Sequence, residues 1–432
     1  KFYGGNPTRD LRDSPIILVG DNNFSKVEPI VAQGYYQFNY IRMWWPIQDY
    51  FDLTPERIKN YFSDPALRSG ILDIWFNRDY SSYGEATGRD FSLPNWSPAD
   101  KMRMYIRKDI VAQLWDYGVS IDADQVIIDP YENKQIDLIP DQIIAGAEGV
   151  SIFNDPRGIA LAPDGSIYVA DSNNHRIVQI LDGEMINEWG SFSPIDANGN
   201  APAGKFYEPW SVAVSPDGEF VYVADTWNHR IQKFTSDGKF LSMWGFFAQS
   251  EDPFAFWGPR DIAIDANGNL YVSNTGNKRI TIFDPDGNFI SQFGNVGFGL
   301  GEFDEPVGVA VSKESGVVYV ADTWNQRIQA FSPNGNNVFS AYNSWDITGW
   351  YGQSLDNKPF LTVGDDQNLY VADPELSRIL VFDPDGEFLY YFGDSSVGIN
   401  NIGIVSDLIP DGEGGLWVSD SQDNRLLHYT LP

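Results

Sequence analysis

A ten-residue pattern recurs six times in this chain, and its period constrains the fold more than any other feature. Each copy is a short apolar strand that ends in an acidic or amide residue, with an arginine five positions later, as in YVADTWNHRI from Tyr222 to Ile231. The strand-end residues are Asp171, Asp225, Asn274, Asp322, Asp373 and Asp420, and the arginines are Arg176, Arg230, Arg279, Arg327, Arg378 and Arg425. Successive copies lie 47 to 54 residues apart. A repeat of this length is one supersecondary unit that cannot bury its apolar faces alone, so the six units must stack.

Every unit carries signals for several strands. The first strand follows a proline, as in WSVAVS from Trp210 to Ser215, and a Pro-Asp-Gly or Asn-Gly turn leads from it into the repeated strand. The third strand starts at the arginine, and in four units a fourth strand ends in Trp-Gly or Phe-Gly. Four antiparallel strands per unit, repeated radially, predict a mainly β chain with a six-bladed β-propeller over residues 151–432.

The units resemble NHL repeats, a propeller family whose pattern is close to P-x-G-I-A-V, D-G, Y-V-A-D and N-x-R-I in order. Blade five departs from this pattern at Leu376, and blade six departs at Asp423 and Asn424. Blade six also shows only three strand signals before Pro432. An uncovered sheet edge promotes aggregation, so we expect the segment 141–146 to add the fourth strand and close the ring.

The repeated aspartate and arginine are predicted to be structural. A carboxylate at a strand end accepts hydrogen bonds from nearby backbone N–H groups, and arginine pairs with carboxylates or carbonyls. NHL-type amidating lyases bind metal through several histidines, but His175 and His229 occupy an ordinary repeat position here, and His428 lies in the last strand. We therefore predict no metal site and no cofactor. Two Asp-Ala-Asn-Gly-Asn segments, 196–200 and 265–269, are predicted to be plain turns, with adventitious Ca²⁺ as the alternative.

Residues 1–125 show no repeat and predict a small α/β module, followed by a linker and the ring-closing strand over 126–150. Strands are expected at 16–20 and 38–45, and helices are expected to begin near Thr54, Asp64 and Ser97. The segments 6–12 and 40–50 resemble the extracytoplasmic region of bacterial membrane glycosyltransferase-like proteins of the mannosyltransferase superfamily. The segment Trp115–Gly118 is similar to part of an oligosaccharyltransferase signature. These resemblances imply a link to a membrane-spanning region outside this chain.

The net charge limits the possible partners. The chain has 60 acidic and 29 basic side chains and a formal charge of −31, and such a field repels nucleic acid and anionic membranes. Cysteine is absent, which excludes disulfides and thiolate metal sites. This composition suits a location outside a bacterial cell, so we expect an extracytoplasmic protein.

Long loops between blades and the turns after the repeated strands share one face of the predicted ring. This long-loop face is rich in aromatic residues, and function concentrates on loops held by a rigid scaffold. The candidate ligand-binding residues are Trp227, Trp324, Trp210, Trp257, Trp350 and Tyr207. They predict a non-catalytic platform for a glycan or a protein. The alternative is that these aromatic residues pack on one another.

A second candidate site lies at the mouth of the central channel. Alignment of the blades brings together Arg157, Arg260, Asp261 and Asp407. Two arginines converging there would hold an anionic group, and the alternative is an arginine–aspartate network that plugs the channel. Two further functions remain open: a hydrolase or lyase with its site at this mouth, and an envelope or filament subunit that self-associates.

Overall fold

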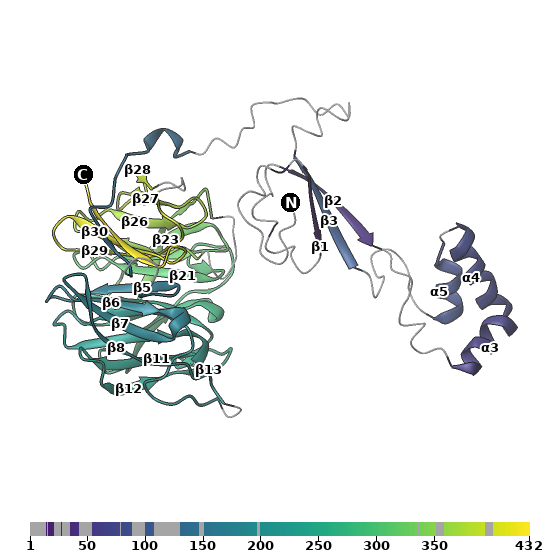
Figure 1. Cartoon of the computed structure of the whole chain (residues 1–432), viewed down its shortest axis with the longest axis horizontal. Helices are drawn as coiled ribbons and strands as arrows, with labels where there is room; N and C mark the ends of the chain where they lie inside the picture. The colour runs from purple at the N-terminus through teal and green to yellow at the C-terminus, as the bar shows by residue number, and fades with distance from the viewer. Residues whose placement is uncertain are drawn as a thin grey trace. The chain divides into compact units, whose positions relative to one another are not determined.

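The chain consists of two compact units, Lys1–Ile127 and Ile128–Pro432. The computed structural model describes residues 14, 16–20, 27, 35–42, 54–77, 79–88, 100–107, 130–146, 151–196, 199–335, 337–350, 358–393 and 401–432 (Figure 1). The segments 6–12 and Trp115–Gly118, and most of 40–50, lie outside these residues, so the glycosyltransferase-like resemblance is not tested by the structure.

The described part of the first unit contains an antiparallel sheet and three helices. The strands are β1 (Ile16–Gly20), β2 (Tyr35–Arg42) and β3 (Asp100–Arg107), in the order β1-β3-β2. The helices are α3 (Pro55–Ser63), α4 (Pro65–Asn77) and α5 (Ser81–Thr87). Asp64 caps α4 by accepting a hydrogen bond from the N–H of Ala66 at 2.8 Å. Among the described residues, no helix combines the length and the apolar composition needed to cross a bilayer.

The prediction of a helix that begins near Ser97 is wrong. Residues 100–107 instead form the central strand β3, which pairs with β1 and β2. The segment KMRMYIR alternates apolar and polar residues with a period of two, which is the period of a strand. That alternation outweighs the local Ser-Pro-Ala-Asp helix start signal.

The described part of the second unit forms six four-stranded antiparallel sheets, which confirms the mainly β propeller. Blades one and two consist of β5 (Pro156–Leu161), β6 (Ile167–Asp171), β7 (Arg176–Leu181), β8 (Glu184–Trp189), β9 (Pro209–Val214), β10 (Phe220–Asp225), β11 (Arg230–Thr235) and β12 (Phe240–Trp244). Blades three and four consist of β15 (Pro259–Ile264), β16 (Leu270–Asn274), β17 (Arg279–Phe283), β18 (Phe289–Phe293), β21 (Pro306–Val311), β22 (Val318–Asp322), β23 (Arg327–Pro333) and β24 (Phe339–Asp346). Blades five and six consist of β25 (Leu361–Val363), β26 (Leu369–Asp373), β27 (Arg378–Phe382), β28 (Phe388–Phe392), β29 (Val405–Pro410), β30 (Gly415–Asp420), β31 (Arg425–Thr430) and β4 (Gln142–Ile144).

The six sheets form a closed ring around their innermost strands. Contacts run in order from β5 to β9, β15, β21, β25 and β29, and from β29 back to β5. Strand β4 pairs antiparallel with β31, with Ile144 opposite Leu426. The expected ring-closing strand near 141–146 is therefore confirmed. Just before it, the Asp141 carboxylate accepts a hydrogen bond from the N–H of Thr430 at 3.0 Å.

The ring closure makes a simple stability prediction. Ile144 is buried against the core that blades one and six share, whereas its neighbour Ile143 is exposed on the same strand. We expect Ile144→Ala to lower the free energy of unfolding by about 2 kcal/mol, because it leaves a cavity at the seam. Ile143→Ala is the matched control and should change it by less than about 0.5 kcal/mol. Equal effects of the two variants in urea denaturation would contradict a seam closed by β4.

Tight turns on the face opposite the long loops let neighbouring blades approach closely. In blade two, Gly238 has a φ of +85°, and a Cβ there would lie 2.6 Å from the ring of Trp189 in blade one. Gly287 in blade three meets Trp244 of blade two in the same way, at 2.7 Å. In blades one and two, the tryptophan that ends the fourth strand thus packs on the turn glycine of the next blade, which fixes the spacing between these blades.

Candidate binding surfaces of the propeller

The repeated aspartate and arginine hold the long loops against the sheets. In blade two the Asp225 carboxylate accepts hydrogen bonds from the N–H of Tyr207 and from Arg230 Nε, both at 2.8 Å. The outer nitrogens of Arg230 donate to the carbonyl oxygens of Ala201, Pro202 and Lys205. The same aspartate–arginine bond occurs between Asp171 and Arg176, Asp322 and Arg327, Asp373 and Arg378, and Asp420 and Arg425. The network therefore sets the loop conformations.

In blade three an asparagine amide holds the loop in place of the aspartate carboxylate. Asn274 accepts a hydrogen bond from the N–H of Trp257 at 3.1 Å and donates to the carbonyl oxygen of Ala255 at 2.7 Å. Both ends of the amide are thus used, and Arg279 Nε has no partner among the described residues. Arg279 still donates to the carbonyl oxygens of Asp252 and Ala255. The loop is therefore held in blade three without the ion pair.

The long loops contain small parallel pairings of their own. Strand β13 (Phe246–Phe247) pairs with β14 (Ala255–Phe256), and β19 (Asn295–Val296) pairs with β20 (Glu302–Phe303). Phe206, Phe256 and Phe303 are fully buried beneath these loops. Part of the aromatic content thus forms the loops' own cores, as the alternative from the sequence suggested.

Two matching aromatic clusters remain on the long-loop face. In the first, the ring of Phe192 lies 4.8 Å from His175 and 5.3 Å from Tyr207. In the second, the ring of Phe247 lies 4.6 Å from His229 and 6.4 Å from Trp257. The histidines occupy the same repeat position in blades one and two, so the clusters are two copies of one arrangement.

The histidines of these clusters hold the next loop in place. Both adopt left-handed backbone conformations, and Nδ1 of His229 accepts a hydrogen bond from the N–H of Gly258 at 3.0 Å. His175 accepts in the same way from the N–H of Glu208 at 3.1 Å. Burial lowers the pKa of His229 to about 4, so its ring is neutral near pH 7, with the proton on Nε2. In the part of the chain that the structure describes, no group of three or more His, Cys, Asp or Glu side chains is gathered for a metal.

The candidate ligand-binding residues divide into exposed and buried sets. Trp257 is 39% exposed and Trp324 is 46% exposed. Trp227 and Tyr207 are half-buried, and Trp227 Nε1 donates to the Glu208 carboxylate at 2.7 Å. The placement of the other two tryptophans on the ligand-binding surface is wrong, since Trp210 and Trp350 are buried. Trp210 packs on Val307 and Phe360 inside the ring, and Trp350 Nε1 donates to the carbonyl oxygen of Ala372.

Sequence reasoning missed several exposed side chains on the same loops. Phe192, Phe246, Val296, Phe298 and Leu300 all present a large apolar surface to solvent, and Phe298 is 79% exposed. Their signal was their place in the long inserts, one to six residues after the glycine of an aromatic-glycine pair. We call Phe192, Phe246, Phe247, Trp257, Val296, Phe298, Leu300 and Trp324 together the aromatic rim.

The mouth of the channel on this face is plugged by Trp210. The guanidinium groups of Arg157 and Arg260 lie over its ring, at 4.1 and 4.8 Å from the ring centroid. Arg157 donates to Asp155 at 2.9 Å, and Arg260 donates to Glu305 at 3.4 Å. The two arginines therefore converge, as expected, but they converge on an aromatic ring with carboxylates beside them.

The two channel aspartates lie on inner strands that face each other across the ring. A bulge interrupts the pairing of β5 with β6 and that of β21 with β22, which leaves the N–H groups of Ile159 and Val309 without a partner on the neighbouring strand. The N–H of Ile159 donates to Asp407 and the N–H of Val309 donates to Asp261, each at 2.8 Å. Ser211 Oγ also donates to Asp261, at 3.0 Å. The alternative of an arginine–aspartate network is thus wrong for Asp261 and Asp407, because the partners of these carboxylates are backbone N–H groups and a serine. The bulges create donors that the carboxylates satisfy.

Burial perturbs both of these carboxylates. It raises the pKa of Asp261 to about 7. Burial, and then the facing Asp261 carboxylate, raise the pKa of Asp407 well above its usual range. Two such groups cannot both ionise without cost in a shared apolar setting, so one proton is retained near neutral pH.

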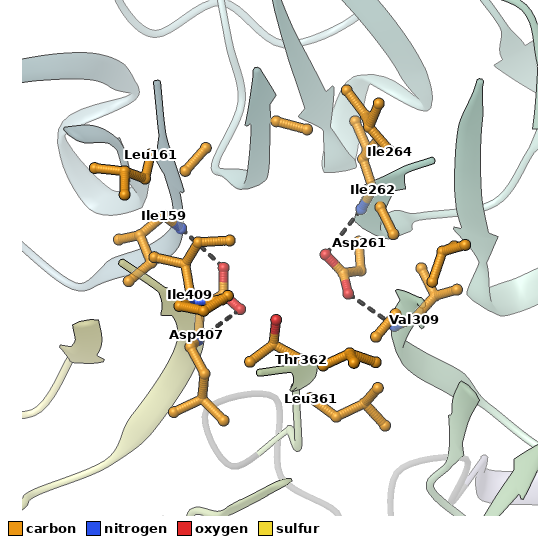
Figure 2. Close-up of a pocket in the computed structure, with 18 of the residues that line it drawn as sticks. Ile159, Leu161, Asp261, Ile262, Ile264, Val309, Leu361, Thr362, Asp407 and Ile409 are labelled. Atoms are coloured by element: carbon orange, nitrogen blue, oxygen red, sulfur yellow. Dashed lines mark hydrogen bonds between the residues drawn. The ribbon is translucent and has the colours of Figure 1, made fainter. Parts of the chain in front are cut away.

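A cavity of about 370 Å³ occupies the channel below Trp210. We call it the cup. Figure 2 shows Asp261, Asp407 and Thr362 directed into it between aliphatic side chains that include Ile159 and Ile264. Lys313, Glu314, Asp365 and Gln367, which belong to the turns after the inner strands, line its other end. The cup is therefore closed toward the long loops and open toward the opposite face.

Four segments of the second unit match the NHL repeat: residues 153–180, 206–234, 256–283 and 303–331. Each begins in the loop that leads into a blade and ends in the third strand of that blade. Four of the six blades are NHL repeats. The match covers blades one to four.

Curated relatives of the NHL propeller cover limited parts of it. Peptidyl-glycine alpha-amidating monooxygenase of Mus musculus is 29% identical over 164 residues, which is 35% of this chain and 16% of that protein. NHL repeat-containing protein 2 of Gallus gallus is 37% identical over 82 residues, which is 18% of this chain and 11% of that protein. The chain thus spans less than a fifth of the length of either relative.

Solved structures similar to the NHL propeller match more of the chain at lower identity. A gluconolactonase from Xanthomonas campestris is 15% identical with a TM-score of 0.45, over 65% of this chain and 87% of that chain. A streptogramin B lyase is 14% identical with a TM-score of 0.44, over 67% of this chain and 87% of that chain.

The two faces of this NHL propeller differ in chemistry. The long-loop face carries the aromatic rim. The turns of the opposite face carry two basic residues, Lys239 and Lys313, and sixteen acidic ones: Asp164, Asp182, Asp217, Glu219, Asp237, Asp265, Asp284, Asp286, Glu314, Asp365, Asp366, Asp383, Asp385, Glu387, Asp411 and Glu413. We call this the acidic face. It offers a very different surface to a partner from the one that the long loops present.

Proposed function

We propose that this NHL propeller is a non-catalytic binding platform that docks a protein partner on the aromatic rim. The observation that carries the proposal is the exposure of large apolar side chains on three consecutive long loops. Soluble proteins rarely expose contiguous apolar patches of this kind unless they bind something. The loops are held by the aspartate–arginine bonds of blades two and four and by Asn274 in blade three, so the surface is presented in one conformation and loses little entropy on binding.

Of the two ligand classes that the sequence left open, the exposed aliphatic residues favour a protein. Sugars stack on flat aromatic rings such as those of Phe247 and Trp257. They gain little from branched side chains such as Val296 and Leu300, which protein interfaces bury readily. The rim combines both kinds of side chain, as the centre of a protein interface does.

A hydrolase or lyase at the channel mouth is the competing function. There the Glu305 carboxylate pairs with Lys358 at 2.8 Å and with Arg260. Burial acts to raise the pKa of Glu305, but Lys358 and Arg260 lower it to about 2. A carboxylate with this pKa is a fixed negative charge and a poor proton donor near neutral pH. The pairing supports a structural role for the mouth.

We further propose an extracytoplasmic location and attachment to a membrane-spanning region outside this chain. The absence of cysteine, the net charge of −31 and the resemblance of the first unit to membrane glycosyltransferase-like proteins support this proposal. Labelling of intact cells with a membrane-impermeant reagent tests it. Labelling of this chain only after lysis would contradict it.

Truncation of the rim is expected to weaken partner binding strongly. The double variant Phe247→Ala and Trp257→Ala removes one aromatic cluster, and we expect at least about a tenfold loss of affinity, because exposed aromatic anchors dominate interface energies. The matched control is Phe289→Ala, which removes an exposed aromatic ring from the outer strand β18. The partner is first captured by cross-linking to the wild-type protein and is then measured in purified form.

Three results separate the alternatives. Equal affinity of the double variant and the control would contradict the rim as the binding surface. Binding on a glycan array that is lost in the double variant would replace the protein partner with a glycan. A mass that rises with protein concentration in the wild type alone would identify the partner as a second copy of this chain.

A further inference from the structure

The closed end of the cup presents three oxygen-bearing groups to one small space. The carboxylates of Asp261 and Asp407 come from opposite blades, and the hydroxyl of Thr362 points between them (Figure 2). Thr362 is only 9% exposed, and its hydroxyl makes no hydrogen bond to any of the described residues. A buried hydroxyl without a partner among the described residues, aimed into a cavity beside two carboxylates, indicates a missing hydrogen-bond partner.

The remaining wall of the cup is aliphatic. Branched side chains of the inner strands, among them Ile159, Leu161, Ile264, Val309 and Leu361, surround the polar groups. The volume of about 370 Å³ falls within the range of small-molecule pockets. A ligand that fits must therefore carry a polar group at one end and an apolar body at the other.

The polar end of that ligand must be a cationic donor. The Asp261 and Asp407 carboxylates accept but do not donate when they are ionised, and an ammonium group has three N–H donors for the three groups present. A metal ion fits less well, since Ca²⁺ takes six to eight oxygen ligands and no metal-ligating group of three or more side chains exists among the described residues. The spare lone pairs of the carboxylates suit a small cation that hydrogen-bonds.

The surface around the open end favours the approach of a cation. The acidic face has sixteen acidic and two basic residues in its turns, and three charged residues, Lys313, Glu314 and Asp365, line the entrance. A surface with a large excess of one sign of charge concentrates ligands of the opposite sign. A cation is thus attracted toward the opening of the cup.

We propose that the cup binds an organic ammonium ion, with the ammonium group between Asp261, Asp407 and Thr362 and an aliphatic or aromatic body against the apolar wall. The chemical class is a primary amine with an apolar chain, either as a free small molecule or as a side chain of a partner. This site opens on the face opposite the aromatic rim and shares no residue with the rim, so it does not rest on the function proposed above.

Binding should exchange a proton for the ligand. The facing carboxylates retain a proton near neutral pH because burial raises their pKa values. An ammonium group between them supplies the positive charge instead, so ionisation becomes favourable and the proton leaves. The titratable groups nearest the site are Asp261 and Asp407, with Lys313, Glu314 and Asp365 at the entrance. Affinity should therefore rise as the pH rises from about 5 to about 8.

Titration calorimetry of the full chain tests the site with n-hexylammonium, its neutral counterpart n-hexanol, and Ca²⁺ as probes. We expect n-hexylammonium to bind at least about tenfold more tightly than n-hexanol, because the alcohol cannot supply the charge. Runs in two buffers of different ionisation enthalpy should show release of about one proton. Free n-hexylamine and a lysine-containing peptide, compared in the same assay, separate the two sources of the ammonium group.

Two variants connect the binding to the named residues. Asp407→Asn should weaken n-hexylammonium binding at least about tenfold, and the nearly isosteric Thr362→Val should weaken it about threefold. The matched control is Thr281→Val, which removes another buried threonine hydroxyl without a partner, on β17 and away from the cup. Thr362→Val keeps the test valid if Asp407→Asn fails to fold.

Several outcomes would overturn the proposal. The site does not bind ammonium ions if n-hexylammonium produces no heat up to about 10 mM, or if n-hexanol binds equally well. Tight Ca²⁺ binding that excludes n-hexylammonium would replace the amine with a metal. Equal affinities for Thr362→Val and Thr281→Val would remove Thr362 from the site.

Discussion

Replacing Asp225 with alanine is expected to lower the free energy of unfolding by about 3–5 kcal/mol. The Asp225 carboxylate is fully buried and accepts hydrogen bonds from Arg230, Asn228, Gln232 and the N–H of Tyr207. Removing it leaves the buried Arg230 guanidinium without its ion-pair partner and frees the loop that leads into blade two. Urea denaturation of the purified second unit or the full chain measures the loss.

The chain itself supplies the matched control for this change. Blade three uses Asn274 at the equivalent position and keeps the loop bonds to Trp257 and Ala255. Asp225→Asn should therefore lower the free energy of unfolding less than Asp225→Ala does. We expect the difference between the two variants to be about 1–2 kcal/mol. An alanine variant as stable as the asparagine variant would show that the ion pair and the loop bonds add little, contrary to the role assigned to the network.

Raising the pH from about 4 to about 8 is expected to destabilise the propeller through the cup. The pKa of Asp261 is raised to about 7 and that of Asp407 is also raised, so the folded state binds more protons than the unfolded chain in this range. Their contribution to stability is complete below the ordinary aspartate pKa and is lost as the pH rises through the raised value. Each additional proton bound by the folded state lowers the free energy of unfolding by about 1.4 kcal/mol for each unit by which the pH rises.

A comparison with Asp407→Asn isolates this contribution. Other buried carboxylates, including Asp225, Asp322 and Asp420, also have pKa values raised by burial, so the slope of the wild type contains several groups. Asp407→Asn removes one of the facing charges, and its unfolding free energy should fall less steeply between pH 5 and 8. Parallel curves for the two proteins would mean that the carboxylates are not coupled across the channel.

The sequence predicts the propeller well because its information is local and repeated. The roles of turn residues such as Gly238 and strand-end residues such as Asp225 are determined by the residue types at a few neighbouring positions. In the first unit no pattern repeats, so each local signal has to be interpreted from a single occurrence. There the cap signal near Ser97 competed with the two-residue alternation of 100–107, and pairing with β1 and β2 decided in favour of a strand.

The candidate sites were only partly predictable for a different reason. Alignment of the blades brought Arg157, Arg260, Asp261 and Asp407 to the channel, because equivalent positions must meet at the axis. It did not predict their partners, which depend on the inner-strand bulges and on the single large ring of Trp210 at the centre. The burial of Trp350 likewise depends on a backbone carbonyl of blade five that no short motif encodes.

The seam of the ring has a consequence for how the protein forms. Strand β4 pairs with β31, so residue 144 must find residue 426, and blade six cannot be completed until nearly all of the propeller has left the ribosome. Contacts this distant in sequence form slowly and late. Until then β4 has no pairing partner and the sheet of blade six has an unpaired edge, so the synthesis of this protein includes an interval in which an open ring must be protected from pairing with other chains.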